Sequence, residues 1–103
     1  MRKVTSEIRA AFISGQKRSV GNTNTDGETV WLFGNAIIKK VDSHIEFTLA
    51  GWNTVTTRER IKGITGINLY QSGGLPMVDG QVIEDTGWYE ISLNNALPIR
   101  ANI

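Results

Sequence analysis

Turn-forming residues recur along this chain at short intervals, and they constrain its fold more than any other feature. They lie at Asp26-Gly27, Gly34-Asn35, Asp42-Ser43, Ser72-Gly73-Gly74 and Asp79-Gly80. These residue types favour tight turns, and several of them tolerate the left-handed backbone that two-residue hairpins require. Most of the segments between the turns are too short for an ordinary helix, so the spacing predicts an antiparallel β-meander.

The segments between these turns have the composition of strands. Residues 45–49 and 88–93 alternate apolar and polar side chains, which is typical of strands with one buried face. We predict strands over 29–33, 36–40 and 45–49, and later over 67–70, over 77–78 with 81–83, and over 88–93. Residues 20–25 are rich in Thr and Asn and alternate only weakly. The residues from about 94 to 103 have no regular pattern, and we expect an irregular tail there.

Near the N-terminus the periodicity changes to that of a helix. The apolar residues with helical spacing are Val4, Ile8, Ala11 and Phe12. They share one face of a helix that we predict over residues 5–14, and this face is expected to pack on the sheet. Thr5 or Ser6 can cap the start of the helix, and Gly15 can end it.

A second, shorter helix is predicted near residues 57–62, between the two sets of strands. Thr56 and Glu59 have the spacing of a capping box, in which each side chain accepts a hydrogen bond from the backbone N–H of the other residue. Gly63 follows at the place where a left-handed residue commonly ends a helix. A helix of less than two turns is not stable alone, so the surrounding fold must hold it.

These elements together predict an α+β fold, with the N-terminal helix packed on the meander. The length of 103 residues is near the commonest size of one domain, and we expect a single domain over 1–103. The absence of Cys excludes disulfides and thiolate metal sites. No apolar run reaches the roughly 20 residues of a membrane-spanning helix.

The charge of the chain is small but unevenly distributed. A net charge of +1 argues against a strongly basic nucleic-acid-binding protein. Cations predominate over residues 1–18, whereas the charged residues of 76–92 are all acidic. The two regions are either solvated faces that attract each other weakly, or the ends of a polarised molecule that presents a basic surface to phosphate or to an acidic partner.

Residues that could support catalysis are few. His44 is the only histidine, and it adjoins Asp42 and Ser43 in a predicted turn. The members of a catalytic triad converge from separate positions, which neighbours in one tight turn do not readily do. The acidic residues near position 80 lack the spacing of a calcium-binding loop. We therefore expect no enzymatic activity, no metal and no cofactor.

The segment 50–63 is the strongest candidate for a binding site, because it combines a tryptophan, three Thr hydroxyls and three cations. The candidate binding residues are Trp52, Asn53, Thr54, Thr56, Thr57, Arg58, Arg60 and Lys62. Hydroxyls and cations at a helix start can contact phosphate, since the free N–H groups there also favour an anion. Trp52 either fills the core beneath the short helix or forms an exposed platform for a base or a partner's side chain.

The three cations of this segment cannot all share one surface. Residues 58 and 62 are neighbours on a helix, while residue 60 points elsewhere. Arg58 and Lys62 either form surface ion pairs, with Glu59 or with a more distant acid, or contribute to binding. Arg58 is the best placed for binding, because it lies in the first helical turn.

The segment also resembles a set of small proteins encoded by tailed bacteriophages. The resemblance rests on Gly21-Asn22-Thr23, on Leu32-Phe33-Gly34-Asn35 and on Ala50-Gly51-Trp52-Asn53-Thr54-Val55-Thr56-Thr57-Arg58-Glu59-Arg60-Ile61. It covers roughly residues 20–64. In that pattern His often stands at the position of Phe33, Leu at that of Ile61 and Asn at that of Lys62. The resemblance implies a phage origin and action in the cytoplasm of the infected bacterium, and it implies no particular activity.

Two functions fit these observations. In the first, the protein is a non-enzymatic phage accessory protein that binds nucleic acid, with Trp52 stacking on a base and the Thr and Arg residues contacting phosphate. In the second, it is a protein-binding module that inhibits a host enzyme or defence complex. The cluster of Thr, Arg and Trp favours the first, and the small net charge favours the second. The expected partner is accordingly a nucleic acid or a host protein.

Overall fold

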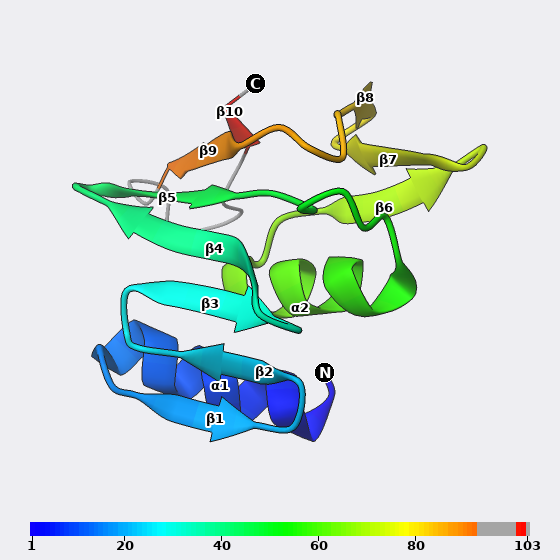
Figure 1. Cartoon of the computed structure of the whole chain (residues 1–103). Helices are drawn as coiled ribbons and strands as arrows, with labels where there is room; N and C mark the ends of the chain where they lie inside the picture. Colours follow the sequence, from blue (N-terminus) through cyan, green and yellow to red (C-terminus); the bar gives the residue numbers. More distant parts are fainter. Residues whose placement is uncertain (93–100, 103) are drawn as a thin grey trace.

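The computed structural model describes residues 1–92 and 101–102 of the chain (Figure 1). The helices are α1 (Lys3–Ser14) and α2 (Val55–Thr65). The strands are β1 (Arg18–Val20), β2 (Thr23–Thr25), β3 (Thr29–Leu32), β4 (Asn35–Val41), β5 (His44–Phe47), β6 (Leu69–Ser72), β7 (Leu75–Val78), β8 (Gln81–Val82), β9 (Tyr89–Ser92) and β10 (Ala101–Asn102). The predicted α+β class is confirmed.

The strands form two antiparallel sheets. The large sheet has seven strands in the order β1-β2-β3-β4-β5-β9-β10, and the small one has the order β6-β7-β8. The first five strands are a meander, after which the chain forms α2 and the small sheet before β9 returns to pair with β5. Figure 1 shows α1 beside β1 and β2, and α2 below β6; α2 also contacts β4. The small sheet is thus an insertion into the larger one.

One hydrophobic core joins both helices to the sheets. Ile8 and Phe12 of α1 are buried, as the helical spacing predicted, and they join a cluster that includes Phe47 of β5 and Ile61 of α2. Val4 is partly buried against the same cluster. The two helices also contact each other directly. The core therefore holds α2, which carries most of the candidate binding residues, in a defined position.

Helix α1 begins earlier than predicted and has a different start. Arg2 is the residue before its first turn, and no side chain caps it. Thr5 lies inside the helix, where it is buried and donates a hydrogen bond to Glu59 of α2, so the prediction of a Thr5 or Ser6 cap was wrong. Gly15 does end the helix with a left-handed φ of 74°, as expected for a glycine at this position.

Helix α2 is longer than predicted, and its caps differ. Thr54 is the N-cap, and its hydroxyl accepts a hydrogen bond from the backbone N–H of Thr57 at 3.2 Å. Thr56 is therefore not the cap, and the predicted capping box was wrong. The helix ends at Gly66, which has a φ of 81°, and not at Gly63.

Gly63 has another role, which is to let α1 and α2 approach closely. A Cβ atom at this position would lie 2.5 Å from Cγ2 of Thr5. No real side chain tolerates such a contact without movement of its neighbours. The glycine that seemed to end a helix is thus a packing residue in its interior.

The strands differ from the prediction mainly at two places. Residues 18–25 form the β1–β2 hairpin, so five strands and not three precede α2. The turn between β3 and β4 is Phe33-Gly34, one residue earlier than predicted, because β4 begins at Asn35. In the predicted irregular tail, Ala101–Asn102 pair with β9. The rest of that tail, 93–100 and 103, lies outside the described residues.

Candidate functional site

The structure places the candidate binding residues at four separate locations. Trp52, Thr54 and Thr56 line a pocket together with Thr57. Asn53 and Arg58 are joined by a hydrogen bond beside this pocket-lining loop. Arg60 is buried, and Lys62 is exposed in the last turn of α2. The eight residues therefore do not form one surface.

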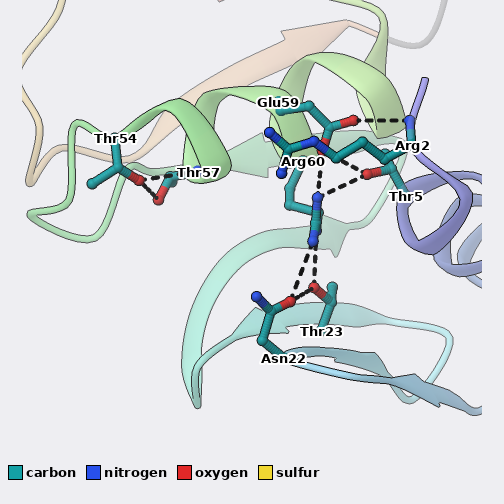
Figure 2. Close-up of polar contacts among 8 residues, drawn as sticks. All are labelled: Arg2, Thr5, Asn22, Thr23, Thr54, Thr57, Glu59 and Arg60. Carbon is teal, nitrogen blue, oxygen red and sulfur yellow. Dashed lines mark hydrogen bonds and ion pairs between the residues drawn. The ribbon is translucent and has the colours of Figure 1, made fainter.

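Arg60 belongs to the interior of the protein, and Figure 2 shows its polar contacts. Its side chain is only 4% exposed. Nε donates to Thr23 Oγ1 at 2.9 Å, and Nη1 donates to Thr5 Oγ1 at 3.1 Å and forms an ion pair with Glu59. Nη2 donates to Asn22 Oδ1 at 3.3 Å. A guanidinium with these partners links α2 to α1 and β2, so we remove Arg60 from the candidate binding residues.

Glu59 is partly buried, completes this network and does not cap α2. Its Oε1 accepts a hydrogen bond from Thr5 Oγ1 at 2.6 Å, and its Oε2 accepts one from the backbone N–H of Arg2 at 3.5 Å. Burial raises the pKa of Glu59, but hydrogen bonds from Thr5 and Arg60 oppose it, and the net pKa lies below the ordinary value of 4.5. The carboxylate is thus ionised, and it holds the start of α1 against α2.

Arg58 and Asn53 connect the loop after β5 to the hairpin of the small sheet. Nη1 of Arg58 donates to Asn53 Oδ1 and, at 3.2 Å, to Gln71 Oε1. Nδ2 of Asn53 donates to the same Gln71 oxygen at 3.1 Å and to the carbonyl of Gly74 at 3.4 Å. These bonds hold the loop that carries Trp52.

A pocket of about 380 Å³ lies between the β3–β4 turn, the loop after β5 and the first turn of α2. Its lining residues are Leu32, Phe33, Asn35, Ile37, Leu49, Trp52, Thr54, Thr56 and Thr57. The aliphatic side chains of this set are buried, whereas Phe33 and Trp52 are 72% and 59% exposed. We name this site the Phe33–Trp52 pocket; among residues 1–92 and 101–102, none of the residues that line it is charged.

The sequence left two alternatives for Trp52, a residue that fills the core beneath α2 or an exposed platform, and its position decides between them. Its large exposed fraction means that it does not fill the core beneath α2. The backbone N–H of Trp52 donates to the carbonyl of Leu49 at 2.8 Å, which closes a tight turn through Ala50 and Gly51. This turn presents the indole ring at the edge of the pocket.

Phe33 is the exposed aromatic residue of the pocket that the sequence prediction did not include. It has a φ of 50° and is followed by Gly34 with a φ of 80°. Its N–H donates to the carbonyl of Asn22 at 2.8 Å. The sequence contained one signal, an aromatic residue beside a Gly-Asn turn pair, but the prediction placed Phe33 at the end of a strand.

Backbone strain is concentrated beside this pocket. Within the described part of the chain, the residues other than glycine with a positive φ are Phe33, Asp42, Ala50 and Asp79. Asp enters this left-handed region more readily than other residues, because its short polar side chain bonds locally. Phe33 lines the pocket, and Ala50 lies between the lining residues Leu49 and Trp52. The two least favourable cases therefore both adjoin the pocket.

Within the described residues, the side chains considered for catalysis or metal binding do not form a comparable site. His44 begins β5, and its Nε2 and Nδ1 lie 3.3 Å from Glu46 and 3.5 Å from Glu90. Over residues 1–92 and 101–102, no group of three or more His, Cys, Asp or Glu side chains could hold a metal ion. Within the same residues, no helix is both long and apolar enough to cross a membrane.

Comparison with known proteins identifies the family of the chain. No curated protein and no solved structure matches it. The family described as Kyanoviridae Gp96 protein matches residues 1–95, which is most of the sequence. The expected phage origin is confirmed: the chain belongs to the Kyanoviridae Gp96 family and is a phage protein.

Proposed function

We propose that this protein binds another protein through the Phe33–Trp52 pocket. The observation that carries the proposal is the pair of largely exposed aromatic residues around an uncharged, apolar pocket. Exposed apolar clusters on small proteins commonly mark interaction sites. The central part of a protein interface is rich in aromatic residues and poor in charges. Both properties describe this pocket.

A further exposed apolar residue adjoins the pocket-lining residues in the chain. Val55, the first residue of α2, is 64% exposed and follows the pocket-lining Thr54 in the chain. The neighbouring polar residues are uncharged amides and hydroxyls, such as Asn35 and Thr56. A partner's apolar side chain in the pocket, surrounded by polar contacts, would reproduce the usual arrangement of an interface.

Nucleic-acid binding is the second candidate, and the exposure of Trp52 favours it. An exposed indole ring can stack on a base with little dependence on sequence. The cations that were expected to contact phosphate are less suitable, however, because Arg60 is buried and Arg58 is hydrogen-bonded to Asn53 and Gln71. Phosphate contacts by Lys and Arg supply most of the affinity in non-specific nucleic-acid binding. We therefore place protein binding first.

The membership in a phage family suggests where the partner is found. We propose that the partner is a host enzyme or defence complex, which the protein meets in the cytoplasm of the infected bacterium and inhibits by occupying its surface. Inhibition of this kind needs no catalytic residues in the phage protein. It needs only a stable fold and a contact surface, which the core and the Phe33–Trp52 pocket are proposed to supply.

Affinity capture from infected-cell lysate tests the proposal, with three immobilised forms of the protein. These are the wild type, Trp52→Ala, and Val82→Ala as a control that removes an exposed apolar side chain of β8. We expect a host protein that is retained after nuclease treatment, lost from Trp52→Ala and kept by Val82→Ala. Calorimetric titration of the purified host protein should then show direct binding. Retention that disappears with nuclease would favour nucleic acid, and retention that is independent of Trp52 would contradict a role for the pocket.

A further inference from the structure

The fold does not require an aromatic residue at the position of Phe33. It lies in the two-residue turn between β3 and β4, where both central residues have a positive φ. Such turns favour Asn, Asp or Gly, because a bulky side chain crowds the following carbonyl in this conformation. A phenylalanine therefore makes this turn less stable than the usual residues would.

Packing does not compensate for this backbone strain. The side chain of Phe33 is 72% exposed, so little of its apolar surface is removed from water on folding. Its backbone hydrogen bond from N–H to the carbonyl of Asn22 is available to any residue other than proline. Strained residues of this kind tend to occur where a structure binds or reacts, and Phe33 lines the pocket.

We propose that Phe33 selects the partner by recognising an aromatic side chain inserted into the Phe33–Trp52 pocket. The inference rests on the proposed protein-binding function and adds the residue that determines specificity and the chemistry of the group it binds. The pocket is uncharged, which matches an uncharged ring and disfavours phosphate or a charged side chain. Two exposed rings offer faces and edges to a third, and aromatic pairs stabilise one another beyond the area that they bury.

The polar residues of the pocket also suit an aromatic side chain with a polar group. Thr54 and Thr57 bond to each other, with their hydroxyl oxygens 2.9 Å apart. Asn35 and Thr56 also line the pocket, and within the described residues their side chains make no hydrogen bond. The amide of Asn35 and the hydroxyl of Thr56 can each accept a hydrogen bond from an indole N–H or a phenol O–H. They can also donate a hydrogen bond to a phenol oxygen. Tyr and Trp are therefore the best-matched anchors.

The test uses peptides selected on the wild-type protein from a displayed random library. The selected peptides are expected to share a Tyr, Trp or Phe, and replacing this residue by Leu should weaken binding about tenfold or more, measured by calorimetry. Binding of each peptide is then compared among the wild type, Phe33→Asn, Trp52→Ala and Val82→Ala. Thermal melts of the same samples, and of Phe33→Gly as a second variant that suits the turn, report stability.

We expect Phe33→Asn to lower peptide affinity without lowering the melting temperature. Phe33→Asn should lose about tenfold or more in peptide affinity while melting at the same temperature or higher, because Asn suits the turn. Val82→Ala should bind as the wild type does. Peptides that need Trp52 but bind Phe33→Asn equally well would overturn the inference and leave the proposed function intact, and a lower melting temperature for both Phe33→Asn and Phe33→Gly would overturn the argument from strain.

Two other outcomes bear on the proposed protein-binding function and on the kind of group that occupies the pocket. If the library yields no peptide that depends on Trp52, both the proposed function and the inference are wrong. The same four proteins are therefore also titrated with a single-stranded oligothymidylate. Binding of the oligonucleotide that requires Phe33 would show that the pocket accepts a base, and it would replace the aromatic side chain as the occupant.

Discussion

Arg60 and Thr23 are joined by a buried hydrogen bond, 2.9 Å from Nε to Oγ1, between residues that are 37 positions apart in the chain. The bond links α2 to β2, and the same guanidinium also reaches Thr5 of α1. It therefore ties the helix beside the pocket to two other elements. Arg60, which the sequence indicated as a candidate binding residue, therefore stabilises the fold.

Replacing Arg60 should accordingly destabilise the protein strongly. We predict that Arg60→Ala lowers the free energy of unfolding by about 3 kcal/mol or more, because it leaves Glu59 without its buried cation. Arg58→Ala is the matched control from the same helix, and it should cost about 1 kcal/mol or less, since its hydrogen bonds lie nearer the surface. Denaturant titration of both variants measures the difference. Equal losses would show that the Arg60 network contributes no more to stability than the hydrogen bonds of Arg58.

The stability should also depend on pH through Glu59. Its pKa is lowered in the folded protein, so the ionised form stabilises the fold above the unfolded pKa, and this contribution is lost as the pH falls through the folded value. The loss should therefore lie below about pH 4.5, the ordinary value for this group. Glu59→Gln should be less stable at pH 7 and should lose less stability on acidification below pH 4.5. Parallel pH curves for the two proteins would refute this role.

The N-cap of α2 offers a direct comparison between two threonines. We predict that Thr54→Ala lowers stability by about 1 kcal/mol, because its hydroxyl accepts from the N–H of Thr57. Thr56→Ala should change stability by no more than about 0.5 kcal/mol, since no hydrogen bond of its side chain occurs in the described structure. Chemical denaturation of the two variants is sufficient, and the reverse order would mean that the helix begins two residues later.

Gly63 should not tolerate alanine, although alanine is the better helix former. We predict that Gly63→Ala costs about 1–3 kcal/mol by overpacking, because its Cβ would lie 2.5 Å from Cγ2 of Thr5. Thr5→Ser removes that methyl group and keeps the hydroxyl that bonds to Glu59. The double variant should therefore recover part of the loss, which a double-mutant cycle can measure. Strictly additive effects would show that the two positions do not meet.

The outline of the fold was predictable because it depends on local patterns. The spacing of Ile8 and Phe12 identified the buried face of α1, and the turn pairs identified the meander. The β1–β2 hairpin was less visible, because Thr23 and Thr25 are polar residues in buried positions. Thr23 is hydrogen-bonded to Asn22 and Arg60, and Thr25 to the carbonyl of Thr29. Such partners do not appear in a hydrophobic pattern.

The candidate site was predictable only in part, for a related reason. Trp52 and Thr54 were correctly grouped as neighbours, since they lie close in the sequence and share the pocket. Phe33 was not included, because it comes from the distant β3–β4 turn and its strain depends on a one-residue shift of that turn. The burial of Arg60 likewise depends on Thr5 and Thr23, which only the tertiary fold brings to it.

The most direct test of the central claim is to map the contact surface with the captured host protein. Backbone amide resonances of the isotope-labelled phage protein would be recorded by NMR with and without the purified partner. We predict shifts concentrated at the Phe33–Trp52 pocket, in the β3–β4 turn, residues 49–53 and the first turn of α2. Shifts confined instead to the basic residues 1–18 or to the acidic residues 79–90, with the pocket unchanged, would contradict the account.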